Sequence, residues 1–106
     1  MWAKSVYVQH QHSPVTVLCL VTSSVTSQIR HQLEQQHCRV QEVESIANPH
    51  NSNPRFADTF TKLNAWQLSE FHRVLLMDAD TIVLKPLDAL FHTDLSNADV
   101  AAVGDW

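Results

Sequence analysis

The sequence has very little glycine, because Gly104 is the only one among 106 residues. Loops that approach phosphate groups usually need glycine, so this scarcity is a first indication that part of an enzyme domain is missing. Charged residues make up only 17% of the chain, and the net charge is −4. Because no basic field is present, we expect no nucleic acid partner.

Cysteines and long apolar runs are also scarce. The two cysteines, Cys19 and Cys38, lack the paired spacing of metal sites, and we predict two free thiols rather than a disulfide. No apolar run approaches the roughly 20 residues of a membrane span. Residues 1–4 show no charged region followed by an apolar one, so no signal peptide is predicted. We therefore expect a cytoplasmic chain, with the secretory pathway left open if an anchor lies upstream of Met1.

Apolar runs alternate with amphipathic stretches along the chain. The run 15–21 (V-T-V-L-C-L-V) predicts a strand buried in a parallel sheet. An apolar stripe predicts a helix over residues 24–36, with Arg30 on its solvated face. Residues 39–46 predict a more exposed strand. The remaining predicted elements are a loop at 48–54, a helix at 58–70, a strand at 73–77, a helical turn at 87–91 and a strand at 99–103.

This order predicts an α/β fold with three or four strands and helices packed on them. No linker or internal repeat divides the chain, so residues 1–106 form one unit. On the predicted helix 58–70, Phe60, Leu63 and Trp66 share one face, and we expect Trp66 to pack in the core.

Two carboxylates, Asp78 and Asp80, follow the predicted strand 73–77. Side chains two residues apart in an extended chain point the same way, and ligands bind at the carboxyl ends of such strands. A hard divalent ion such as Mn²⁺ or Mg²⁺ suits paired carboxylates and shares its other positions with a diphosphate. Thr81 offers a hydroxyl nearby. The alternative is turn chemistry, in which aspartate caps backbone amides.

Flanking residues extend the pattern into a family resemblance. The stretch from Phe60 to Phe91 contains a T-K-L helix start with a later tryptophan, a basic-apolar strand, D-A-D-T and a short D-x-L-F turn. Together these residues resemble glycosyltransferase family 8, the glycogenin-like retaining transferases. The earlier stretch S-P-V-T-V-L-C-L-V-T-S-S-V is similar to a strand and helix of the nucleotide-sugar-binding half.

The resemblance implies a GT-A fold that binds a nucleotide-sugar, usually a UDP-sugar, with Mn²⁺. In that family Asp78 and Asp80 match the metal ligands, and Ala79 contributes backbone beside the donor. Lys62 matches a lysine near the donor sugar and phosphates, where a cation favours charge on a departing diphosphate. Asp105 resembles an aspartate close to the donor sugar.

The resemblance also implies that the chain is an internal fragment of a catalytic domain. Family members begin with a strand that holds the base and continue beyond the position of Trp106 to a histidine that completes the metal site. We therefore expect weak transfer or none from this chain. The donor sugar and the acceptor, a glycan or a protein, stay open.

Two other functions remain as alternatives. A phosphatase of the haloacid-dehalogenase type ends its first strand in D-x-D-x-T, but here the threonine comes one position early, at Thr81. A non-catalytic module is the second alternative, acting by self-association or by binding a full-length partner. Its apolar contacts would include Trp2, Trp66 and Trp106.

Overall fold

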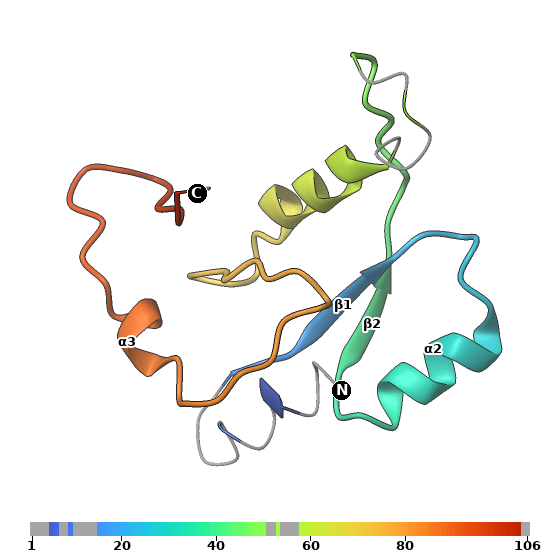
Figure 1. Ribbon diagram of the computed structural model, residues 1–106, viewed down its shortest axis with the longest axis horizontal. Coiled ribbons are helices and arrows are strands. Elements are labelled where there is room, and N and C mark those ends of the chain that lie inside the picture. Colours follow the sequence, from blue (N-terminus) through green and yellow to red (C-terminus); the bar gives the residue numbers. More distant parts are fainter. Residues whose placement is uncertain (1–4, 7–8, 10–14, 51–52, 54–57, 105–106) are drawn as a thin grey trace.

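A computed structural model describes residues 5–6, 9, 15–50, 53 and 58–104. Asp105 and part of the predicted loop 48–54 lie outside these residues. Among the described residues, no helix is both long and apolar enough to span a membrane. The elements with defined bounds are β1 (Leu18–Val21), α2 (Ser27–Glu34), β2 (Arg39–Glu42), the 3₁₀ helix η2 (Thr59–Gln67) and α3 (Asp88–Phe91), all drawn in Figure 1.

The first three of these elements form a βαβ unit. β1 and β2 pair in parallel, with Leu18 aligned with Arg39 and Val21 with Glu42. The Val43 N–H continues the ladder by donating to the Val21 carbonyl at 2.8 Å. Parallel neighbours need a crossover connection, which α2 supplies. The predicted α/β organisation is therefore confirmed, with strands shorter than the apolar runs suggested.

Local side-chain chemistry sets the limits of α2. The hydroxyl of the N-cap residue Thr26 accepts a hydrogen bond from the Ile29 N–H at 3.4 Å. After the helix, His37 has a φ of 62°, a left-handed conformation that cannot continue an α-helix. The helix begins at Ser27, directly after its N-cap, and ends at Glu34, so it is shorter than the predicted range 24–36.

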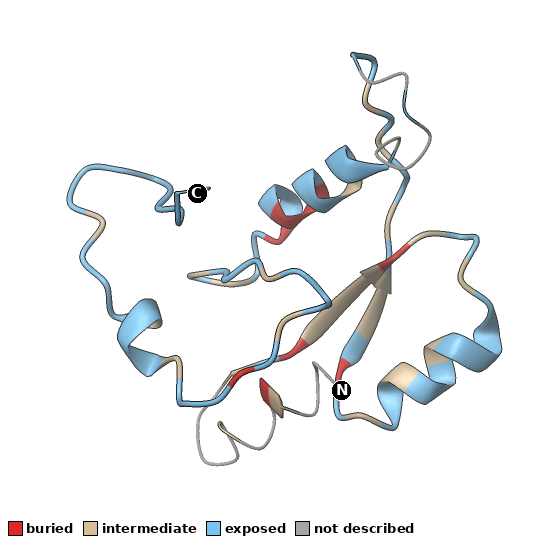
Figure 2. Cartoon of the chain, viewed as in Figure 1, coloured by how far each residue is buried: buried red, intermediate tan, exposed pale blue. Residues whose placement is uncertain are grey.

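The core joins residues that are far apart in the sequence. Val6, Val17, Cys38 and Val83 are buried together, and Figure 2 shows how few parts of the chain reach this degree of burial. The Val83 N–H also donates to the Ser5 hydroxyl at 3.0 Å. The segment after D-A-D-T is thereby fixed against the start of the chain and against β1. Partly buried residues that pack on this core are Val15, Cys19, Leu33, Met77 and Leu87.

The predicted helix 58–70 is present as the 3₁₀ helix η2, and its buried face was predicted wrongly. In a 3₁₀ helix residues three apart share a face, so Phe60, Leu63 and Trp66 still lie together, but they face solvent. Trp66 is 64% exposed. The buried positions are Asn64 and Ala65, because side-chain hydrogen bonds hold that side against the segment after β2.

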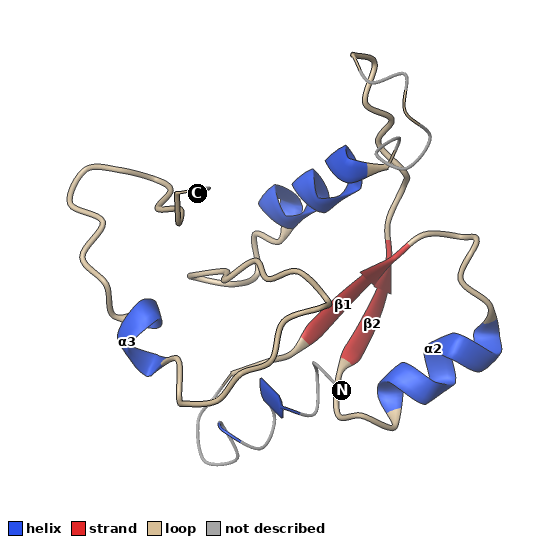
Figure 3. Ribbon diagram, in the orientation of Figure 1, coloured by secondary structure: helices blue, strands red, loops and turns tan. Residues whose placement is uncertain are grey.

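The predicted strands 73–77 and 99–103 were also wrong. Figure 3 shows loop in both places, and the sheet of the described residues has two strands instead of three or four. A strand exists through its ladder of hydrogen bonds, and no described segment pairs with either run. Leu76 and Val103 are 45% and 92% exposed, so these apolar sequences lack a layer to pack against.

Candidate donor-binding site

The D-A-D-T motif forms a tight turn. The Thr81 N–H donates to the Asp78 carbonyl at 3.2 Å, and the Thr81 hydroxyl donates to the same oxygen at 2.7 Å. Ala79 and Asp80 occupy the exposed centre of the turn. The two carboxylates are therefore positioned by a turn and not by the alternation of side chains along a strand. The expected turn chemistry is present, but it uses backbone and threonine atoms and leaves the carboxylates to other partners.

Lys62 lies beside this turn. Its Nζ is 3.5 Å from Asp78 Oδ1, which brings together two predicted site residues from η2 and the D-A-D-T turn. The two side chains are 52% and 72% exposed. Ion pairs with this degree of exposure contribute about 0–1 kcal/mol, so either partner can exchange the other for a ligand at little energetic cost.

Neighbouring polar residues orient η2 and so place Lys62. The Thr61 hydroxyl accepts a hydrogen bond from the Ile46 N–H at 3.1 Å. The Asn64 amide donates to the Glu44 carbonyl at 2.9 Å and to the Thr61 carbonyl at 2.8 Å. These contacts tie η2 to the chain leaving β2. The sequence singled out Thr61 only as part of T-K-L and gave Asn64 no role, although a T-x-x-N pair within an apolar helix was a usable signal.

The two carboxylates of the D-A-D-T turn suit a divalent ion. Asp78 and Asp80 offer the carboxylate oxygens that Mn²⁺ and Mg²⁺ prefer. Within the part of the chain that the structure describes, no three His, Cys, Asp or Glu side chains gather around one point. The residues present therefore fit an ion that keeps several positions for water and phosphate oxygens, which is the usual state of Mg²⁺ in nucleotide sites.

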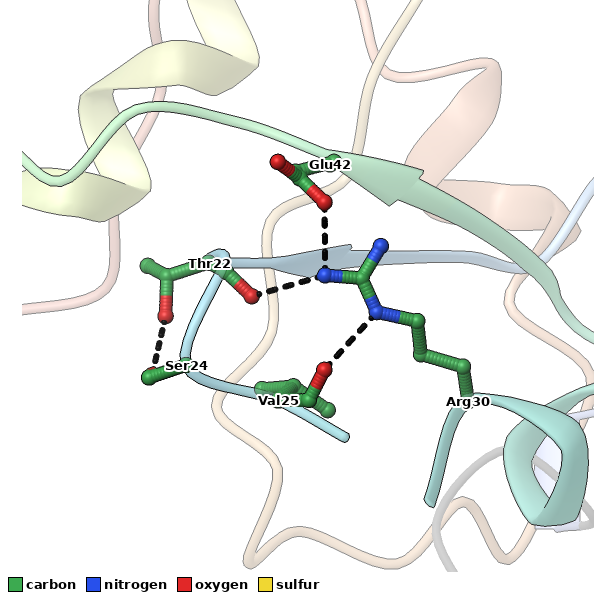
Figure 4. Close-up of polar contacts among 5 residues, drawn as sticks. All are labelled: Thr22, Ser24, Val25, Arg30 and Glu42. Atoms are coloured by element: carbon green, nitrogen blue, oxygen red, sulfur yellow. Dashed lines mark hydrogen bonds and ion pairs between the residues drawn. The ribbon is translucent and has the colours of Figure 1, made fainter. Parts of the chain in front are cut away.

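A second polar cluster lies at the carboxyl ends of β1 and β2, shown in Figure 4. The Arg30 guanidinium donates to the carbonyls of Val25 at 2.9 Å and Thr22 at 3.1 Å, and pairs with Glu42 at 2.6 Å. The prediction that Arg30 is solvated was wrong, since its side chain is only 26% exposed. Because two carbonyls and a carboxylate already engage this cation, the cluster connects α2 to the sheet.

Comparison with known proteins assigns the family. The sequence profile described as glycosyl transferase family 8 matches residues 1–106. The chain belongs to glycosyl transferase family 8. The resemblance inferred from T-K-L, D-A-D-T and D-x-L-F is thereby confirmed. The comparisons give no support to the phosphatase alternative.

Three curated relatives show the breadth of the family. Glycogenin-1 of Caenorhabditis elegans is 34% identical over an alignment of 97 positions, which covers 82% of this chain and 21% of that protein. Galactinol synthase 2 of Solanum lycopersicum is 32% identical over an alignment of 107 positions, which covers 97% of this chain and 29% of that protein. Inositol phosphorylceramide glucuronosyltransferase 1 of Arabidopsis thaliana is 32% identical over 76 residues, 71% of this chain and 14% of that protein.

The chain thus spans less than a third of the length of each of these relatives. No solved structure matches the chain.

Proposed function

We propose that this chain carries the nucleotide-sugar-binding part of a retaining glycosyltransferase with a GT-A fold. The complete enzyme would move a hexosyl or related group from a UDP-sugar to a glycan or protein acceptor. The observation that carries the proposal is the placement of Lys62 Nζ 3.5 Å from Asp78 Oδ1 at the exposed D-A-D-T turn of a family 8 chain.

Asp78 and Asp80 would hold Mn²⁺ or Mg²⁺ in this proposal, and Ala79 would lie beside the donor through its backbone. A bound ion would neutralise the negative charge that develops on a leaving diphosphate. Lys62 would supply a second positive charge, because its Nζ lies 3.5 Å from Asp78 Oδ1. Asp105 is proposed to lie near the donor sugar, on the family resemblance alone.

The curated relatives inform two parts of the proposal, which are the identity of the donor sugar and the activity of this chain by itself. The relatives are named a glycogenin, a galactinol synthase and a glucuronosyltransferase, so the family match supports glycosyl transfer as the class of reaction and leaves the sugar open. Because the chain spans less than a third of each of these proteins, we propose that it binds the donor and transfers sugar weakly or not at all by itself.

Calorimetric titration of UDP into the purified chain tests this function. We expect binding with Mn²⁺, and a loss of affinity of about tenfold or more without the ion or in the double variant Asp78→Asn, Asp80→Asn. Asp99→Asn is the matched control, because Asp99 is an exposed aspartate outside the site. Lys62→Met should weaken UDP binding more than Lys85→Met, which removes another exposed lysine.

Two results would contradict the proposal. UDP binding that is equally tight with and without Mn²⁺ would remove the role of the two carboxylates. Absence of binding by a chain whose circular dichroism shows a cooperative thermal transition would mean that the donor site is not present here.

A further inference from the structure

Cys19 of β1 and Cys38, the residue directly before β2, form a close pair of thiols. Their sulfur atoms are 3.4 Å apart, with Cys19 donating to Cys38, and Cys38 donates in turn to the Leu33 carbonyl at 2.8 Å. Both cysteines are free, as the sequence predicted.

The sheet register explains why these sulfurs meet. Leu18 aligns with Arg39, so Cys38 lies one residue before the aligned pair and Cys19 one residue after it. Side chains that are two positions apart on a strand lie on the same face, and aligned residues of parallel strands share that face. Cys19 and Cys38 are therefore diagonal neighbours on one side of the sheet, in contact with the same core.

We propose that Cys19 and Cys38 are a redox-active dithiol, which a small-molecule disulfide oxidises to an intramolecular disulfide joining β1 to β2. A disulfide bond is about 2.05 Å long, so the sulfurs must approach by about 1.4 Å, a movement that side-chain rotation and a small backbone adjustment supply. The oxidation uses only the two thiols and no carboxylate, histidine or lysine of the described residues. This inference is therefore independent of the proposed donor site.

The reaction balances with oxidised glutathione as the oxidant. One cysteine loses its proton and attacks a glutathione sulfur, releasing one glutathione thiolate and forming a mixed disulfide. The second cysteine loses its proton and attacks the protein sulfur of that mixed disulfide, releasing the other glutathione. Two protein thiols are oxidised to one disulfide, and one glutathione disulfide is reduced to two thiols.

The structure assigns an order to the two steps. Cys19 is half-buried and meets the oxidant first, whereas Cys38 is 5% exposed and closes the bond from within the core. Burial, together with the hydrogen bond to Cys38 and the charge that a Cys38 thiolate would carry, raises the pKa of the Cys19 thiol to about 12. Little Cys19 thiolate exists at neutral pH as a result, so the mixed disulfide forms slowly.

The test incubates the native chain with oxidised glutathione, denatures it, and treats it with iodoacetamide before intact-mass measurement. The expected product is a monomer that is lighter by two hydrogen atoms, takes up no iodoacetamide and carries no glutathione. Cys38→Ser cannot close the bond, so it should retain glutathione on Cys19. Two alkylated thiols in the wild-type chain, two glutathione adducts or a covalent dimer would each overturn the proposal.

A thermal measurement separates a bond within the native sheet from one that forms only on unfolding. The oxidised chain should melt at least about 5 °C higher than the reduced chain, because the bond constrains the unfolded state. Dithiothreitol should reverse the shift. An unchanged or lower melting temperature would overturn the proposal, since it would show that the native sheet does not accommodate the disulfide.

Discussion

The described residues at 15–50 and at 58–104 contribute to this molecule in different ways. The first region pairs its backbone within the βαβ unit, and its one large exposed hydrophobic side chain is Ile29. The second region holds the D-A-D-T turn and Lys62, yet it consists of loops, turns and two short helices. Its large exposed hydrophobic residues are Phe60, Leu63, Trp66, Val74, Leu75, Leu76, Ile82, Leu84, Leu90, Val100 and Val103.

The comparison shows that strand-like sequence becomes a strand only where a neighbour is present. The backbones of residues 18–21 and 39–42 hydrogen-bond to each other. Val74 to Leu76 also have apolar side chains, but they remain in a loop. The candidate site consequently depends on a few tertiary contacts. Those contacts are the Lys62–Asp78 pair, the Asn64–Glu44 hydrogen bond and the anchoring of Val83 on Ser5.

The largest expected loss of stability comes from a substitution in the core that the two regions share. Val17→Ala removes two methyl groups from a side chain that is 8% exposed, and we expect it to lower the free energy of unfolding by about 2 kcal/mol. Ile82→Ala, at a side chain that is 60% exposed, should lower it by less than about 0.5 kcal/mol. Urea denaturation measures both. Similar losses in the two variants would contradict the account, because they would show that Ile82 is packed as tightly as Val17.

A smaller effect is expected at the contact that orients η2. Asn64→Ala removes two hydrogen bonds and leaves the Glu44 carbonyl without its partner, which should cost about 1–2 kcal/mol. Amide hydrogen exchange in η2 should accelerate by a larger factor than in β2. Gln67→Ala is the control, because Gln67 is an exposed residue of the same helix. Equal acceleration in η2 and β2 would contradict the separate anchoring of η2.

The smallest expected effect is the difference in coupling energy between two ion pairs, one inside the first region and one that joins the two regions. Double-mutant cycles with Met at arginine and Gln at glutamate should give about 1 kcal/mol of coupling for Arg30–Glu42, which are 2.6 Å apart. Arg39–Glu70 should give less than about 0.5 kcal/mol, because those side chains are 3.4 Å apart and about half exposed. A reversed ranking would mean that the contact between regions is the stronger one.

The sequence predicted the βαβ unit and the helical turn at Asp88–Phe91 because their signals are local. The apolar run of β1, the stripe with Leu33 and the crossover length lie within a short window of chain. The family resemblance placed Lys62 near the donor sugar and phosphates, and that role stays a prediction. The predictions of strands at 73–77 and 99–103 were wrong. An apolar pattern shows which side chains a segment would bury, but it does not show whether a neighbouring strand is available for hydrogen bonding.

The site differs from its prediction for a similar reason. The pairing of Asp78 with Lys62 comes from a turn and a 3₁₀ helix, whose approach rests on Asn64 and Thr61 rather than on any periodic pattern. Arg30 reads as a surface residue by periodicity, and only the fold brings two carbonyls and Glu42 to its guanidinium.

The most direct test of the proposed donor site is Mn²⁺ titration followed by electron paramagnetic resonance, which reports the free aqueous ion. With UDP present, the wild-type chain should bind Mn²⁺ at least about tenfold more tightly than the Asp78→Asn, Asp80→Asn variant, and more tightly than it does without UDP. Equal Mn²⁺ affinity in the two proteins, or no effect of UDP on the wild-type chain, would contradict the assignment of D-A-D-T as the metal and diphosphate site.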